Sequence, residues 1–281
     1  MKQLLIVLLI ISLTSSLAYS EKTDNSEQNW NEWSAPKPPE KNKWLSLAGL
    51  YWLKQGVSSI GSAKGNTHQF PSTAPANLGK IEVTKEGVFF SRPNDSLKIK
   101  LEPDTDSRVV FDSFSFQIIQ REDTFAIRLQ DSQNPSIKKF KGKHYFPWNK
   151  SLVVDAKFIP ETKDKTLKIQ TVYGTLRSVP AAGWIEFELE GKKQRLHAVG
   201  AQDSETLFVM FKDKTSEATT YGAGRYMDID RPMGTEKMVI DFNYAYNPPC
   251  AITTFATCPL PPRSNHLKLP IQAGEKYTAD H

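Results

Sequence analysis

The residues best suited to chemistry lie between positions 219 and 275. Hydrogen-bonding side chains stand there among apolar residues, prolines and aromatic rings. A polar group left unpaired in apolar surroundings costs about 1–3 kcal/mol. Each of these groups is therefore expected to find a partner, in another side chain or in a ligand. The candidate ligand-binding residues are Tyr221, Arg225, Asp241, Asn243, Asn247, Asn265 and Glu275.

An arginine and a carboxylate suggest the first kind of site. Arg225 follows a glycine-flanked turn and Asp241 leaves an apolar strand, so the two could face one another across paired strands. The leading hypothesis is a pocket for a small polar or anionic ligand, with Arg225 as a bidentate donor. The alternative is a periplasmic hydrolase in which Asp241 or Glu275 is the general base and Arg225 stabilises an anion. In a third, structural interpretation the pair is a buried salt bridge, with Asn243 and Asn247 fixing the loop.

Two cysteines, Cys250 and Cys258, lie in the same stretch. In an oxidising compartment the expected state is a disulfide that closes this short loop. Free thiols that act in catalysis or bind a metal are the alternative, although the C-x-x-C redox spacing is absent. A zinc site that adds His266 lacks the paired spacing of zinc ligands, so no metal is predicted.

Recognised catalytic motifs are missing from the sequence. There is no G-x-S-x-G, H-E-x-x-H, P-loop or G-x-G-x-x-G motif. A triad of Ser216, Asp213 and His197 lacks the strand-to-helix turn that would expose the serine. Whether the protein is an enzyme therefore stays open, and no cofactor is predicted.

The first twenty residues predict export. Lys2, the apolar run at 4–13 and the small residues at 17–20 are typical of a secretory signal peptide over residues 1–20. A retained anchor is the alternative, but the run is shorter than the roughly 20 apolar residues of a spanning helix. No other segment approaches that length, so no transmembrane segment is expected after cleavage. The mature protein is expected to be periplasmic or secreted.

The charge of the chain argues against nucleic acid as a partner. Cleavage of the leader removes Lys2 and takes the formal net charge from +5 to +4. This mild excess is spread along strand-like segments, which is typical of the solvated face of a sheet. The expected partner is a small molecule or a component of the cell envelope.

Short apolar runs at about ten-residue spacing predict a mainly β protein with antiparallel, sandwich- or barrel-like halves. Residues 21–43 are polar and rich in proline, which predicts a tether, within which Trp30 and Trp33 could form a short docking turn. Residues 44–160 are expected to form the first half. Residues 161–281 are expected to form the second half, ending in an irregular cap held by the disulfide.

Tight turns are predicted between three pairs of strands. Glycine or a short polar residue accepts the positive φ that two-residue hairpins require. The expected hairpin tips are Glu86–Gly87, Glu122–Asp123 and Glu190–Gly191.

Several blocks of the sequence resemble a known family. WLSLAGLYWLKQG, FKGKHYFPW, DKTSEATTYGAGRY, DFNYAYNPPCA, CPLPP and AGEK are similar to the bacterial family catalogued as domain of unknown function 1684. The resemblance extends from about Trp44 to Tyr277 and implies no catalytic residue, because that family has no established activity. It implies that the matching C-terminal positions are the family's distinctive feature: Tyr221, Gly224, Arg225, Asp241, Asn243, Asn247, Cys250, Cys258, Pro259, Asn265 and Glu275.

A second resemblance covers part of the first half. Residues 59–62 and 70–79 are similar to the recognition loops of forkhead-associated domains, which are β-sandwiches that bind phosphothreonine. Ser62 stands where that family places a phosphate-binding arginine, and Asn77 stands near its usual histidine. The resemblance therefore implies the sandwich fold without phosphopeptide binding, because the bidentate guanidinium contact is missing.

Overall fold

The structure is a computed structural model that describes residues 26–95, 97–234 and 236–278. The signal peptide predicted over residues 1–20 lies outside the described residues. The chain divides into two compact units, Met1–Pro36 and Lys37–His281. No helix in the described part of the chain is long and apolar enough to cross a membrane.

Part of the segment predicted as a tether is helical. The first unit contains helix α2 (Ser26–Ser34), which includes both Trp30 and Trp33. The second unit begins with the short 3-10 helix η1 (Pro39–Lys41), in which proline at the first helical position fits because its missing N–H would be unpaired there.

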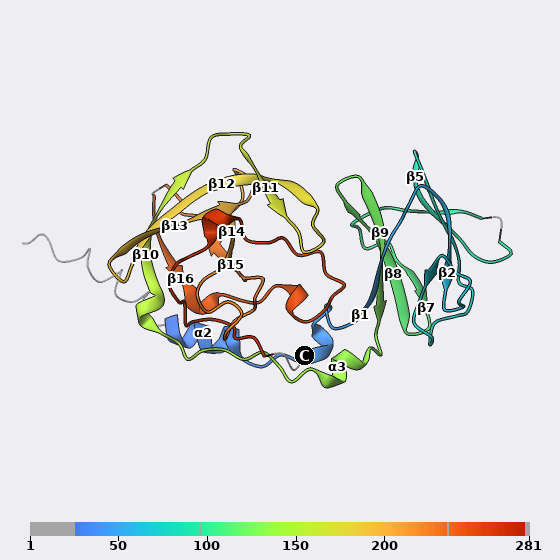
Figure 1. The fold of residues 1–281 in the computed structure, drawn as a ribbon, viewed down its shortest axis with the longest axis horizontal. Helices are drawn as coiled ribbons and strands as arrows, with labels where there is room; N and C mark the ends of the chain where they lie inside the picture. Colours follow the sequence, from blue (N-terminus) through green and yellow to red (C-terminus); the bar gives the residue numbers. More distant parts are fainter. Residues whose placement is uncertain (1–25, 96, 235, 279–281) are drawn as a thin grey trace, which may run out of the picture. The chain divides into compact units, whose positions relative to one another are not determined.

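Two sheets form the first half of the second unit (Figure 1). Within each sheet the strands pair antiparallel, except that β2 and β3 are parallel. The first sheet has the order β1 (Leu47–Trp52), β9 (Thr124–Asp131), β8 (Phe114–Arg121), β7 (Val109–Phe111). The second has the order β3 (His68–Gln69), β2 (Gly56–Gly61), β4 (Gly79–Thr84), β5 (Gly87–Ser91), β6 (Ile99–Leu101).

These two sheets pack face to face as a sandwich. Phe116 of β8 contacts Phe90 of β5 edge-on, with ring centroids 5.6 Å apart, and both rings are buried. Ile81 and Ile127, from opposite sheets, belong to the same buried cluster. Alternating apolar residues on each strand supply this core, as expected for strands that each bury one face.

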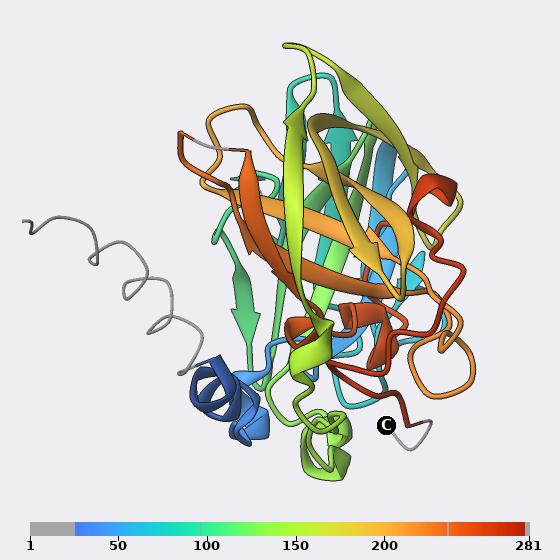
Figure 2. The ribbon, with the colours of Figure 1, turned by 90° about the vertical axis from the view of Figure 1, so that its left-hand side faces the viewer.

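One curved sheet forms most of the second half. Its order is β15-β14-β13-β12-β10-β16, with β11 paired to β12, and its strands curve into a nearly closed barrel (Figure 2). The strands are β10 (Val153–Pro160), β11 (Thr166–Gln170), β12 (Leu176–Leu189), β13 (Lys192–Val199), β14 (Thr206–Phe211), β15 (Arg225–Asp230) and β16 (Lys237–Asp241). The boundary predicted at residue 160 places β10 in the first half. The strand pairs with β12 and β16, so the curved sheet begins before residue 160.

Two of the expected hairpin tips are confirmed, and the third is shifted by one residue, because the turn between β4 and β5 is Lys85–Glu86 and Gly87 begins β5. Arg121 pairs with Thr124 across Glu122–Asp123, and Leu189 pairs with Lys192 across Glu190–Gly191. Thr84 pairs with Gly87 at the tip of β4 and β5. Glu190 and Gly191 have φ angles of 52° and 70°, the positive values that a type I′ turn requires.

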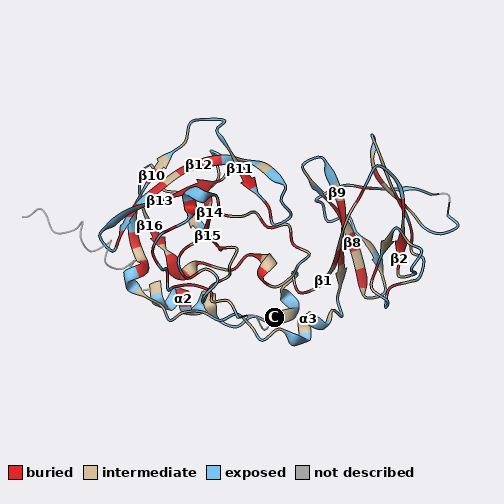
Figure 3. Cartoon of the chain, viewed as in Figure 1, coloured by how far each residue is buried: buried red, intermediate tan, exposed pale blue. Residues whose placement is uncertain are grey.

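The C-terminal segment is part of the core of the second half. Leu267, Leu269, Ile271 and Ala273 are buried and alternate with exposed residues, and they join the cluster formed by the strands. Buried residues accordingly occur both on the curved sheet and on the segments it encloses (Figure 3). The remaining short helices are α3 (Pro135–Lys139), η2 (Lys150–Leu152), η3 (Phe242–Tyr244), η4 (Pro249–Ala251) and η5 (Arg263–Asn265).

The prediction of a disulfide in this cap is wrong. Cys250 and Cys258 are both free cysteines. The cap is held instead by apolar burial and by buried hydrogen bonds, which are described below.

Gly274 tests how tightly the C-terminal segment is packed. Its φ is +75°, and a Cβ added there would overlap the carbonyl oxygen of Ala245, whereas Gly191 has φ +70° and open space around it. Gly191→Ala is expected to cost about 1–2 kcal/mol from left-handed strain alone. Gly274→Ala is expected to cost clearly more, as measured by urea unfolding. Equal losses in the two variants would contradict this packing.

Candidate functional site

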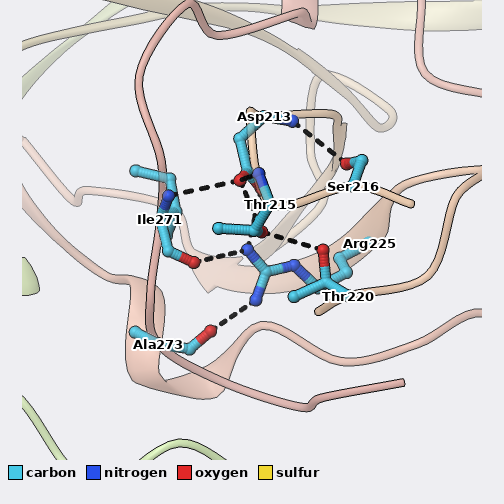
Figure 4. Close-up of polar contacts among 7 residues, drawn as sticks. All are labelled: Asp213, Thr215, Ser216, Thr220, Arg225, Ile271 and Ala273. Carbon is cyan, nitrogen blue, oxygen red and sulfur yellow. Dashed lines mark hydrogen bonds and ion pairs between the residues drawn. The ribbon is translucent and has the colours of Figure 1, made fainter. Parts of the chain in front are cut away.

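The two Nη groups of Arg225, at the start of β15, find all their acceptors inside the protein (Figure 4), while its buried Nε has none among the described residues. It is 1% exposed. Its Nη2 donates to Asp213 Oδ2 at 2.8 Å and to the carbonyl of Ile271 at 2.9 Å, and its Nη1 donates to the carbonyl of Ala273. Burial lowers the pKa of Arg225, and the charge of Asp213 opposes that shift. The expected pairing of Arg225 with Asp241 is therefore wrong, because Asp213 takes that place.

Asp213 connects this arginine to two further segments. Its Oδ1 accepts hydrogen bonds from the backbone N–H of Thr215 at 2.7 Å and of Ile271 at 3.2 Å (Figure 4). The hydroxyl of Ser216 accepts from the Asp213 N–H at 3.3 Å. His197, the third member of the triad considered above, instead contacts Glu161 at 3.7 Å, so the triad does not assemble.

Asp241 ends β16 and caps the short helix η3. Its Oδ1 accepts from the backbone N–H and from the side-chain amide of Asn243, at 2.9 and 2.7 Å. The same amide exchanges two hydrogen bonds with the backbone of Asn149, at 2.9 and 3.0 Å. Burial raises the pKa of Asp241, and the hydrogen bonds from Asn243 oppose that shift. These contacts fit a cap and a loop anchor.

The other predicted residues also have internal partners, except that the buried Oδ1 of Asn247 has none among the described residues. Glu275 is 4% exposed, and its Oε2 accepts from the Asn247 N–H and from Lys143 Nζ, both at 3.0 Å. Asn265 exchanges hydrogen bonds with the backbone of His197 at 2.8 and 2.9 Å and donates to the carbonyl of Met210 at 2.8 Å. The structure thus distributes the predicted site residues over several local networks instead of one pocket.

The two thiols are neighbours without being bonded. The N–H of Cys250 donates to Cys258 Sγ at 3.1 Å, so the sulfur serves as a backbone acceptor in the described structure. The hydroxyl of Tyr221 donates to the carbonyl of Cys250 at 3.0 Å. Hydrogen bonding from Cys258 and Tyr221 lowers the pKa of the Cys250 thiol against the effect of burial. The pKa of Cys258 is raised by its hydrogen bond to Cys250 and by burial.

Two cavities meet at Trp44, and none of the seven predicted ligand-binding residues lines either one. The first, of about 610 Å³, is bounded by Trp44, Asn134, Cys250, Phe255 and Tyr277 among others. The second, of about 240 Å³, we name the Arg128 pocket. It is lined by Lys43, Trp44, Leu47, Asp104, Thr105, Asp106, Arg108, Gln117, Arg128 and Gln130.

Arg128 is the unusual residue of this pocket. It lies on β9, and its guanidinium carbon is 5.6 Å from the ring centroid of Trp44. Its Nε is buried and has no hydrogen-bond acceptor among the residues that the structure describes. No carboxylate within residues 26–95, 97–234 and 236–278 forms an ion pair with it. Burial and the neighbouring charge of Arg121 lower the pKa of Arg128, and the charge of Asp104 opposes that shift.

The two carboxylates that line the pocket both lie near other arginines. Asp104 Oδ1 pairs with Arg121 Nη1 at 3.0 Å, and its Oδ2 accepts from the N–H of Gln120 at 3.2 Å. Asp106 lies 3.9 Å from Arg108. The pocket therefore keeps an excess of positive charge.

Sequence reasoning missed this pocket for a physical reason. Arg128 alternates with Ile127 and Leu129, which belong to the sandwich core, so it lies on the opposite face of the sheet. Such a face is ordinarily solvated. Here Ile119 and Ala126 on that face are 0% exposed, and Arg121 donates to Thr257 Oγ1 of the second half at 3.0 Å.

The buried pair of Arg225 and Asp213 is expected to be essential for stability. Arg225→Met leaves the Asp213 carboxylate buried without its cation, which costs about 3–5 kcal/mol. As a control, Lys157→Met breaks a pair with Glu236 in which both side chains are more than half exposed, and it should change stability little. Urea unfolding of both variants checks this expectation. A similar, small effect of the two changes would contradict a structural role for Arg225.

The thiols are expected to react without prior reduction. Alkylation of the denatured protein with iodoacetamide should add two labels, whereas the native protein should be labelled first at Cys250, since Cys258 is 4% exposed. The labelling rate of native Cys250 should rise at a lower pH than that of an ordinary cysteine, whose pKa is about 8.5, because the pKa of Cys250 is lowered. Tyr221→Phe should move that rise to higher pH. Absence of label in the denatured protein would show a disulfide and contradict the free state.

Part of the chain is similar to known proteins. Residues 138–276 match the model of a family described as "Protein of unknown function (DUF1684)". No curated protein matches the chain. The solution NMR structure of an uncharacterised protein of Haloarcula marismortui is 31% identical, with a TM-score of 0.43, and the similarity covers 51% of this chain and 80% of that one.

The matched residues contain every strand of the curved sheet, both cysteines and the C-terminal segment that packs into its core. The forkhead-associated resemblance of the first half stays a prediction. Residues 138–276 of the chain are thus similar to the DUF1684 family of proteins of unknown function.

Proposed function

We propose that this is an exported protein that binds a small anionic molecule in the Arg128 pocket. The observation that carries the proposal is Arg128, whose Nε is buried without an acceptor and which, unlike Arg225, has no carboxylate partner among the described residues. The signal-peptide pattern of residues 1–20 supports export.

An unpaired guanidinium in a cavity favours an anion. Taking a charged group out of water is costly unless an opposite charge or hydrogen-bond acceptors replace the water. The aromatic face of Trp44 offers Arg128 a cation–π contact of about 0.5–2 kcal/mol, which offsets only part of that cost. A carboxylate or a phosphate matches the planar fork of a guanidinium through two parallel hydrogen bonds.

The surrounding charges favour an anion as well. Lys43, Arg108 and Arg128 line the pocket against Asp104 and Asp106, and both carboxylates already have arginine partners. Charge alone does not distinguish this pocket, because a groove of about 800 Å³ beside the hairpin of β12 and β13 also has more basic than acidic residues. Its charged lining residues are Glu186, Glu188, Lys192, Lys193, Arg195 and Lys268.

The volume of the pocket limits the ligand. Sites for drug-sized molecules usually measure about 300–1,000 Å³, and the Arg128 pocket measures about 240 Å³. The ligand is therefore an anion with few non-hydrogen atoms.

The sites predicted from sequence receive less support from the geometry. Arg225 has three internal acceptors for its Nη groups. Asp241 caps η3, and Glu275 accepts from a backbone N–H and a lysine, so both carboxylates already have structural partners. The hydrolase alternative would need these carboxylates as bases toward a substrate.

The proposal is tested by ligand-induced stabilisation. Thermal unfolding of the wild type is measured against acetate, phosphate and citrate at constant ionic strength. A ligand at 100 times its Kd stabilises the folded state by about 2.7 kcal/mol. We expect this stabilisation from at least one of the three anions, and we expect Arg128→Gln to lose it.

The matched control is Arg195→Gln. Arg195 also stacks on a tryptophan, with its guanidinium carbon 4.3 Å from the ring centroid of Trp184, but it lies outside the Arg128 pocket. This variant should keep the full stabilisation. Stabilisation that survives in Arg128→Gln, or that is absent from the wild type, would overturn the proposal.

A further inference from the structure

Gln117 and Arg128 are direct neighbours across two antiparallel strands. Gln117 of β8 is the register partner of Arg128 of β9. Side chains of directly opposite residues stand on the same face of a sheet, with Cβ atoms about 4.5–5.5 Å apart. Both residues line the Arg128 pocket.

These neighbours have complementary polar atoms that lack partners. Gln117 Oε1 is buried and has no hydrogen-bond donor among the described residues, just as Arg128 Nε has no acceptor. A buried polar atom without a partner costs about 1–3 kcal/mol. A ligand atom beside Arg128 Nε would therefore have to accept a hydrogen bond, and a ligand atom beside Gln117 Oε1 would have to donate one.

Two other neutral polar side chains of the pocket, Gln130 and Thr105, already have partners. Gln130 donates to the hydroxyl of Ser46 at 3.3 Å and accepts from Arg108. The hydroxyl of Thr105 donates to the carbonyl of Glu102 at 2.9 Å. Gln117 is thus the neutral acceptor best placed to recognise a ligand beside Arg128.

We infer that the ligand of the Arg128 pocket is a small hydroxycarboxylate. Its carboxylate accepts from the guanidinium of Arg128, and its hydroxyl donates to Gln117 Oε1. This inference rests on the proposed function and specifies its ligand class. A hydroxyl on the carbon next to the carboxylate places donor and acceptor within the distance that separates two cross-strand neighbours.

Charge selects a hydroxyl over an ammonium group as the donor. An amino acid would bring its positive charge next to Lys43, Arg108 and Arg128. The two carboxylates of the pocket, Asp104 and Asp106, pair with Arg121 and Arg108. Like charges repel at such distances, so an α-amino acid of the same size is expected to bind more weakly than the hydroxy acid.

The test compares ligands that differ by one hydroxyl. Affinities for lactate and propionate, and for glycolate and acetate, are measured by titration calorimetry on the wild type, Gln117→Met and Gln120→Met. Methionine keeps the length of the glutamine side chain and removes its strong acceptor. Gln120 lies on the same strand outside the pocket, so its variant is the matched control.

We expect the wild type and Gln120→Met to prefer lactate over propionate by about fivefold, the worth of one neutral hydrogen bond. Gln117→Met should bind both acids with equal affinity. Equal affinities in the wild type, or a preference that survives in Gln117→Met, would overturn the inference while leaving anion binding intact. Failure of all four acids to bind the wild type would overturn this inference, and failure of phosphate and citrate as well would overturn the proposed function.

Discussion

A guanidinium group that leaves water must find acceptors, and this requirement governs two arginines of the chain in opposite ways. Arg225 has one carboxylate and two backbone carbonyls around it, and it is 1% exposed. The Nε of each arginine is buried without an acceptor among the described residues, but Arg128, which is partly buried against Trp44, also lacks the carboxylate and carbonyl partners that Arg225 has. The first arginine therefore explains how the second half is held together, and the second indicates where an anion binds.

The network of Arg225 is what makes the irregular C-terminal segment a defined structure. Strands β15 and β16 stand at opposite ends of the strand order of the curved sheet. Ile271 and Ala273 of the C-terminal segment belong to the buried core of this sheet. Asp213 receives the Ile271 N–H, while Arg225 donates to the carbonyls of Ile271 and Ala273. Backbone groups that would otherwise be buried without partners are satisfied in this way. Residues that look like a site in the sequence therefore serve as structural anchors.

Alternation and turn chemistry predict much of this fold, because they act locally. The turn at Glu190–Gly191 follows from the sequence, since few residues accept positive φ. The state of Cys250 and Cys258 does not follow, because spacing alone does not determine how two sulfur atoms are oriented. The Arg128 pocket depends on the packing of the second half over the outer face of a sheet, and no local pattern reports such contacts.

The central claim concerns the surroundings of one guanidinium, and NMR observes those surroundings directly. The ¹H–¹⁵N resonances of arginine Nε groups are recorded while lactate is added at constant ionic strength and pH. The account predicts that the Arg128 resonance shifts and saturates, while that of Arg225, which is 1% exposed and whose Nη groups have internal partners, stays unchanged. An unchanged Arg128 resonance, or equal unsaturating shifts of both, would contradict it.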